Sequence, residues 1–206
     1  QLFENCLKNE NLILDVDIIK IDKKNKILVT KNNHKIKYDF LISTTNIDEL
    51  HDYKYGKLNY AGYDIETKII KKSEAHKLDN KEISMLYFPE KKFKHCRISN
   101  YGSFQKKNDY PYKTHTILTI ERPNNKIRLY PTLDEKNTKL FKRYLSETAK
   151  YGNIISFGRL GLYKYLTSDT TIEMVFMLKK YISSWKKMSP INRIKAYKKI
   201  RGGWNN

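Results

Sequence analysis

The amino-terminal part of the chain alternates short apolar runs with polar turns. Residues 12–19 and 26–29 are rich in Leu, Ile and Val, and the polar residues 22–25 separate them. Such runs bounded by Asp, Lys and Asn predict two β-strands joined by a turn. After a second turn at 32–33, the apolar run of residues 38–45 ends in Ser-Thr-Thr, and a short helix is predicted at 46–50. That run is typical of a buried parallel strand whose carboxyl end faces a ligand.

The middle of the chain carries repeated strand patterns without helical periodicity between them. Apolar and polar residues alternate, or apolar residues cluster, over residues 63–70, 83–87, 96–101 and 114–120. Sequential strands without intervening helices predict an antiparallel sheet.

Helical periodicity returns after this sheet. Residues 134–151 predict a helix that ends at Gly152, and an apolar strand follows at 154–157. A second helix is predicted over 169–185, capped by Thr167 or Ser168. Its apolar residues are expected to face the core: Ile172, Val175, Phe176 and Leu178.

The carboxyl-terminal residues are basic. Ser189-Pro190 breaks the preceding helix, and the tail through Arg201 suits one more helix that ends at Gly202-Gly203. We expect the lysine pairs at 179–180 and 186–187 and this tail to form a solvated face.

The charge changes this picture little. The 206 residues carry a formal net charge of +19, but the 41 basic residues are mostly Lys and are spread along the chain. A drift of the whole composition toward Lys, Asn and Ile explains the charge without a nucleic-acid partner, and a small polyanionic substrate fits it equally well. Cys6 and Cys96 give no metal-ligand spacing, so we expect no metal site and a reducing, cytoplasmic compartment. No apolar run is long enough to span a bilayer, and no signal peptide is visible.

Residues 158–165, with the sequence GRLGLYKY, stand out chemically. They place an arginine between glycines after an apolar strand and shortly before a helix. Backbone N–H groups at such a turn and the planar guanidinium both favour an anion, so the residues alone indicate a phosphate or cofactor site.

Several strings together resemble the UDP-galactopyranose mutase family. They are Tyr38-Asp39, residues 47–50 (IDEL) and 52–58 (DYKYGKL), 64–67 (DIET), 129–131 (LYP), 134–137 (DEKN) and the GRLG string at 158–165. These strings occur in the order and spacing of the family, over residues 2–185. The match is stronger than any one motif.

The resemblance implies a flavoenzyme that interconverts UDP-galactopyranose and UDP-galactofuranose. In that family N5 of reduced FAD attacks the anomeric carbon, displaces UDP and forms a sugar adduct, and the sugar recloses as the other ring. The chemistry is covalent catalysis by the cofactor, while the protein holds the diphosphate and aims the sugar.

The resemblance also assigns site residues. Arg159 matches the family's catalytic arginine, and the residues expected to bind substrate are Arg97, Tyr130, Arg159 and Tyr165. The residues expected to approach the cofactor are Gly158, Arg159, Thr167, Ser168 and Asp169. Guanidinium groups bind phosphate bidentately, and phenol hydroxyls are neutral donors to it.

The sequence departs from the family in two ways. His95-Cys96-Arg97 replaces the usual Tyr-Thr-Arg, and Thr167 replaces an acidic residue, which leaves the sugar nucleotide open. The Gly-x-Gly-x-x-Gly string that binds the FAD pyrophosphate is absent. We therefore expect the chain to hold only the second half of the FAD site and not to retain FAD alone. The expected partners are a UDP-sugar and a missing amino-terminal half or second chain; an oligomer stays open.

The predicted fold class is mixed α/β: the carboxyl-terminal part of a Rossmann-like FAD-binding fold with an inserted antiparallel substrate sheet. The expected divisions are 1–59 in the FAD-binding domain, 60–132 in the sheet, 133–185 in the closing helices and GRLG loop, and 186–206 as a basic tail. Two alternatives stay open. One is an amine-oxidase-like FAD enzyme, which would need an aromatic cage instead of arginines. The other is a non-catalytic split or degenerate member that binds a partner or polyanion.

Overall fold

The computed structural model describes residues 2–75, 84–104 and 113–203. The chain divides into two units. The first unit contains Gln1–Gly56 and Leu140–Asn206, and the second contains Lys57–Lys139. The fold is mixed α/β with antiparallel sheets, as the sequence predicted. No helix among the described residues is long and apolar enough to cross a bilayer.

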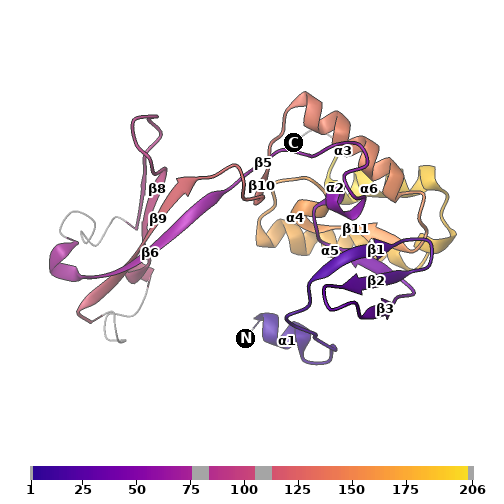
Figure 1. Ribbon diagram of the computed structural model, residues 1–206, viewed down its shortest axis with the longest axis horizontal. Helices are drawn as coiled ribbons and strands as arrows, with labels where there is room; N and C mark the ends of the chain where they lie inside the picture. The colour runs from indigo at the N-terminus through magenta and orange to yellow at the C-terminus, as the bar shows by residue number, and fades with distance from the viewer. Residues whose placement is uncertain (1, 76–83, 105–112, 204–206) are drawn as a thin grey trace. The chain divides into compact units, whose positions relative to one another are not determined.

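The first unit is built from sequence-distant segments (Figure 1). Its strands are β1 (Ile18–Asp22), β2 (Ile27–Thr30), β3 (Lys35–Lys37), β4 (Leu41–Ser43) and β11 (Ile154–Ser156). Its helices are α1 (Leu2–Leu7), α2 (Ile47–Leu50), α4 (Gly158–Gly161), α5 (Ser168–Ile182), the 3-10 helix η3 (Trp185–Lys187) and α6 (Pro190–Arg201). Helix α3 (Glu135–Thr148) spans the boundary between the units.

Strands β1, β2 and β3 form an antiparallel sheet through the turns that the sequence predicted. In the first turn, Asp22 Oδ1 accepts a hydrogen bond from the Asn25 backbone N–H at 2.9 Å. The strand predicted over residues 12–19 lies at Ile18–Asp22, so the prediction placed it too early and shares only residues 18–19 with it. Leu12, Ile13 and Leu14 are more than half exposed, and β2 offers pairing partners only to Ile18–Asp22.

Strand β4 pairs in parallel with β11, with Leu41 opposite Ile154 and Ser43 opposite Ser156. The prediction of a parallel strand within residues 38–45 is therefore confirmed. All three residues of β11 are buried, as is typical of a parallel strand, whereas β4 is covered only in part: Ser43 is buried and Ile42 is 44% exposed.

The second unit holds the predicted antiparallel sheet, in the order β6-β9-β8-β7 (Figure 1). The long ladder joins β6 (Tyr63–Lys71) to β9 (His115–Pro123), and β9 also pairs with β8 (Arg97–Asn100). The remaining elements are β5 (Tyr60–Ala61), the 3-10 helices η1 (Lys72–Glu74) and η2 (Tyr101–Phe104), β7 (Met85–Tyr87) and β10 (Tyr130–Pro131). Ile83, at which we expected β7 to begin, lies outside the described residues.

The carboxyl-terminal tail is a core element on one side and a solvated face on the other, so the expectation of a solvated face is confirmed only in part. The lysine pairs at 179–180 and 186–187 and the α6 lysines at 195, 198 and 199 are exposed as expected. Helix α6 forms and ends at Gly202 as predicted, but Tyr197 and Trp185 are fully buried with ring centroids 5.1 Å apart. The Tyr197 hydroxyl accepts a hydrogen bond from the backbone N–H of Ser156 at 2.9 Å. Arg193 is only 5% exposed. The basic composition of the tail predicted exposure, but a buried arginine can donate its hydrogen bonds to backbone carbonyls. Those carbonyls come from tertiary contacts, which composition does not reveal.

Helix α5 buries only Leu178 of the four residues predicted to face the core. Ile172, Val175 and Phe176 are 48%, 49% and 64% exposed, whereas Met174 and Leu178 are buried. Residues 174 and 178 are four apart and lie on one helix face. The helix has apolar residues on adjoining faces, so periodicity alone could not say which face is covered.

Acid is expected to destabilise the first unit in two steps. Burial lowers the pKa of His51 from 6.5 to about 4, and Thr148 Oγ1 lies 2.7 Å from its Nε2. Hydrogen bonds from Lys150 and Lys54 lower the pKa of Glu147 from 4.5 to about 2. Both groups bind more protons in the unfolded state than in the folded state. The free energy of unfolding therefore falls as the pH drops from 6.5 toward 4, because of His51. It falls again from pH 4.5 toward 2, because of Glu147.

Urea midpoints measured between pH 7 and 2 test this expectation. His51 should contribute about 3 kcal/mol to the fall in the free energy of unfolding. Each unit by which its pKa is lowered is equivalent to about 1.36 kcal/mol. The variant His51→Gln cannot titrate and should flatten the profile between pH 6.5 and 4. An unchanged slope in that variant would contradict the assignment.

Candidate functional site

The candidate site begins where β11 turns into α4. Gly158 has φ +74°, a left-handed conformation that favours glycine, and a Cβ at Gly161 would lie 2.8 Å from Ser156 Oγ. The same Cβ would lie 3.1 Å from the Ser43 carbonyl oxygen. Both glycines of the GRLG string are therefore required by the backbone, and they bring the turn against the end of β4.

Residues 158–164, here called the GRLG turn, fold back so that Arg159 meets the residues after it. Tyr163 has φ +45°, which reverses the chain direction, and its side chain is buried. Arg159 Nη2 donates to the Leu166 carbonyl at 2.6 Å. The Arg159 guanidinium carbon lies 5.3 Å from the centre of the Tyr165 ring, a cation–π distance. The turn therefore brings together two predicted substrate-binding residues.

Helix α5 begins beside this pair. The Thr167 backbone N–H donates to Thr170 Oγ1 at 3.0 Å, which confirms Thr167 as the predicted cap. Thr167, Ser168 and Asp169 are exposed. Hydrogen bonds from the Thr167 side chain and from backbone N–H groups lower the pKa of Asp169. This helix end thus presents to solvent hydroxyl groups and a carboxylate whose position is fixed by hydrogen bonds.

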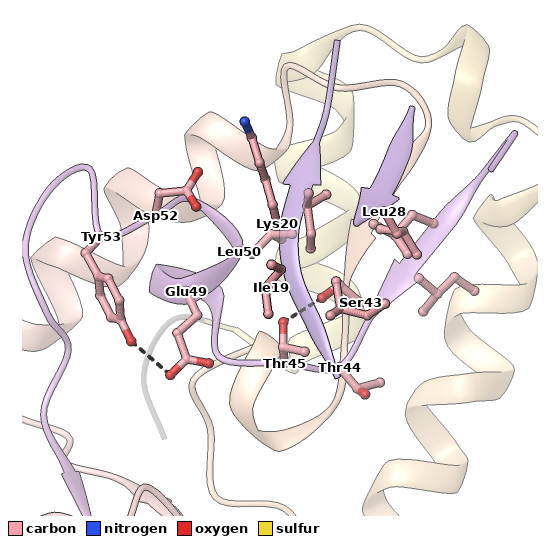
Figure 2. Close-up of a pocket in the computed structure, with 14 residues that line it drawn as sticks. Ile19, Lys20, Leu28, Ser43, Thr44, Thr45, Glu49, Leu50, Asp52 and Tyr53 are labelled. Atoms are coloured by element: carbon pink, nitrogen blue, oxygen red, sulfur yellow. Dashed lines mark hydrogen bonds between the residues drawn. The ribbon is translucent and has the colours of Figure 1, made fainter. Parts of the chain in front are cut away.

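A cavity of about 520 Å³ lies in the first unit beside β1 and the end of β4 (Figure 2). Its apolar wall includes Ile19, Leu28 and Leu50, and its polar residues include Ser43, Thr44 and Thr45. Ser43 Oγ and Thr45 Oγ1 are 2.8 Å apart. A Cβ at Gly158 would lie 3.7 Å from Thr44 Cγ2, so the GRLG turn borders this cavity.

The other two predicted substrate residues belong to the second unit. Arg97, on β8, is engaged within its own sheet: its Nη2 lies 2.6 Å and its Nε 2.8 Å from Glu121 Oε1. Glu121 is 4% exposed, and its hydrogen bond raises the pKa of Arg97. Tyr130, on β10, packs edge-on against Tyr63 with ring centroids 5.7 Å apart. Each unit thus carries an arginine and a tyrosine of the predicted set.

Comparison with known proteins identifies the family. The sequence model of UDP-galactopyranose mutase matches residues 1–165. The chain belongs to the UDP-galactopyranose mutase family.

Two relatives show how much of a UDP-galactopyranose mutase this chain spans. A UDP-galactopyranose mutase of Mycoplasma genitalium is 27% identical over 128 residues, which are 61% of this chain and 31% of that protein. A crystal structure of reduced UDP-galactopyranose mutase matches with a TM-score of 0.66 at 16% identity, over 91% of this chain and 49% of that chain. The chain thus spans less than a third of the curated relative and about half of the solved structure.

The cavity beside the GRLG turn has a mixed lining, in which Lys20, Glu49 and Asp52 join the apolar and hydroxyl side chains. The cavity combines an apolar wall with three hydroxyl side chains at the carboxyl end of a parallel strand. That combination suits a ligand with flat ring systems and polar linkers, and the carboxyl ends of parallel strands are where such ligands bind. The described residues of this family member contain no ion-binding cluster of His, Cys, Asp or Glu.

Sequence reasoning missed some residues of this region. The β1 residues Ile18, Ile19 and Lys20 line the cavity, yet their sequence signals only a strand. The Ser-Thr-Thr ending of residues 38–45 did signal a ligand-facing end, and Ser43, Thr44 and Thr45 do line the cavity. Arg201, which contacts the GRLG turn, lies in the tail for which the sequence assigned no role.

Proposed function

We propose that this chain supplies the diphosphate-binding side of a UDP-galactopyranose mutase, an isomerase of sugar nucleotides. The observation that carries the proposal is the placement of Arg159 against Tyr165 and the Leu166 carbonyl, in a turn that borders the cavity. A guanidinium oriented by a carbonyl and a ring is a planar fork of the kind that binds phosphate bidentately. Family membership supports the same role.

The substrate in this proposal is a UDP-sugar. Arg159 and Tyr165 of the first unit are the proposed donors to the diphosphate. Arg97 and Tyr130, which the family resemblance also assigns to the substrate, are candidate donors within the second unit. Glu121 already fixes the orientation of the Arg97 side chain. Substrate binding would therefore lose little further side-chain entropy at Arg97. Tyr130 is positioned in the same way by Tyr63.

The proposed cofactor is FAD in its reduced form. When bound, reduced flavin supplies the nucleophile for the anomeric carbon of the sugar. This chain would approach FAD with Gly158, Arg159, Thr167, Ser168 and Asp169, through backbone N–H groups at the turn and at the start of α5. The Thr and Ser hydroxyls add donors that an ionised Asp169 cannot give.

A second polypeptide segment completes the cofactor site in this proposal. Among the described residues, β4 pairs with β11 alone, and Ile42 on β4 is 44% exposed beside the cavity. Two-stranded sheets are marginal in isolation. A further strand paired with β4 and followed by a glycine-rich turn would extend the parallel sheet and supply the pyrophosphate contacts that this sequence lacks.

Calorimetric titration of the chain with UDP tests the proposal. We expect saturable binding, and Arg159→Ala should weaken it about 10- to 100-fold, because a charge-assisted hydrogen bond contributes about 1.5–3 kcal/mol. The titrations should be made at low and at moderate salt.

A matched control distinguishes a site from general attraction to a polyanion. Arg143 is exposed in the same unit and also lies over a tyrosine ring, with its guanidinium carbon 4.4 Å from the centre of Tyr55. Arg143→Ala removes the same charge and should leave UDP binding unchanged. Equal weakening in both variants, abolished by salt, would favour the non-catalytic polyanion-binding alternative.

A further inference from the structure

The end of α6 is bonded to three consecutive residues of the GRLG turn. Arg201 Nε donates to the Leu162 carbonyl at 3.1 Å, and its Nη2 donates to the Tyr163 carbonyl at 3.2 Å. In return, Lys164 Nζ donates to the Arg201 carbonyl at 2.6 Å. Arg201 is 3% exposed, so these bonds are shielded from water.

The turn is strained at the point where Arg201 holds it. Tyr163 has φ +45°, a left-handed conformation that costs an aromatic residue about 1–3 kcal/mol unless its surroundings enforce it. Its ring stacks on Phe141 with centroids 5.8 Å apart, and the Arg201 guanidinium carbon lies 5.3 Å from the centre of Phe141. Arg201 therefore contacts both the backbone of the strained residue and the ring that supports it.

This strained residue separates the two members of the candidate site. Arg159 precedes Tyr163, and Tyr165 and Leu166 follow it. The left-handed conformation returns the chain so that Tyr165 and the Leu166 carbonyl reach the Arg159 guanidinium. If Tyr163 relaxed to a negative φ, Tyr165 and Leu166 would move away from Arg159.

We propose that Arg201 is a positioning residue that holds the GRLG turn in the conformation that presents Arg159 and Tyr165 to a diphosphate. The ligand part of this inference rests on the proposed function, whereas the positioning part concerns the conformation of the turn itself. The residue lies in α6, outside the segment that the family model matches.

The chemistry of the site explains an arginine at this position. Its hydrogen-bond acceptors are the carbonyls of Leu162, Tyr163 and Gly203, which lie in different directions. A planar guanidinium carries five N–H donors in a fixed fork and can serve all three, whereas the three donors of an ammonium sit on one nitrogen and do not reproduce that fork. Arg201→Lys should therefore keep the charge and lose the geometry.

The same helix provides a matched control. Arg193 is 5% exposed and also donates to three carbonyls, but those belong to Trp185, Ala149 and Lys186, away from the turn. Arg193→Gln therefore removes an equivalent buried guanidinium from α6 without touching the GRLG turn.

The test compares Arg201→Gln, Arg201→Lys and Arg193→Gln in the full chain. Urea midpoints report overall stability, and amide hydrogen exchange in the absence of urea reports the turn, through the bonds from the Leu162 N–H to Gly158 and from the Lys164 N–H to Arg159. Both glutamine variants should lower the urea midpoint. Only in the Arg201 variants should these two amides exchange at least 10-fold faster than in the unaltered chain. The same variants should bind UDP more weakly by a similar factor.

Each outcome decides the proposal. Equal exchange of the turn amides in Arg193→Gln and Arg201→Gln, or wild-type exchange in Arg201→Gln, would overturn it. If Arg201→Gln does not fold, Arg201→Lys carries the comparison, because it keeps the charge and most of the side-chain volume. If the unaltered chain binds no UDP, the proposed function fails, while the exchange data still decide whether Arg201 holds the turn.

Discussion

A chain that ends after Trp185 is expected to lose the cooperative unfolding of the first unit. The truncation removes Tyr197 from its contact with Trp185 and leaves the buried backbone N–H of Ser156 without its partner. Loss of one large buried aromatic side chain alone costs about 3–5 kcal/mol. Together with the buried Ile200 and the Arg193 bonds, the loss should reach the 5–15 kcal/mol by which native domains are typically stable.

Circular dichroism in a thermal scan measures this effect. The full chain should show a cooperative transition, and the truncated chain should show none for the first unit. Lys195→Ala changes an exposed residue of the same helix and should melt as the full chain does. A truncated chain with an unchanged transition would show that α6 contributes little to the core.

Arg97→Met is expected to destabilise the second unit by about 3 kcal/mol, because breaking a buried ion pair leaves a charge without compensation. Glu121 is 4% exposed in the unaltered chain, on the strand between β6 and β8, and its carboxylate would lose the ion pair with Arg97. Hydrogen exchange of β8 and β9 amides at rising urea concentration reports this loss, with faster exchange expected at lower urea than in the unaltered chain.

The double variant Arg97→Met, Glu121→Leu provides the control. Replacing both partners of a buried pair with apolar residues is often neutral, so the second substitution should restore most of the lost protection. A single variant as stable as the unaltered chain would mean that Glu121 is solvated without its arginine. UDP titration of Arg97→Met then tests its separate role as a ligand.

The sequence by itself determined the element order and much of the candidate turn. Apolar runs with period two, and turns of Asp, Asn and Lys, located β2 and the β6–β9 ladder, because these signals are local, whereas β1 was predicted too early in the chain. The GRLG string located the turn because positive φ and close packing at 158 and 161 tolerate few residues other than glycine. Family resemblance then named Arg159 and Tyr165, which the turn does bring together.

Only the tertiary structure decided which faces are covered and which charges are buried. Helix α5 has apolar residues on more than one face, and the neighbour that covers Met174 and Leu178 is not encoded within the helix. Arg193 and Arg201 look like a solvated basic tail in sequence, yet both are buried among backbone carbonyls. The reason is that a guanidinium can satisfy its donors on backbone groups supplied by residues far away in the chain, and no local pattern announces those acceptors.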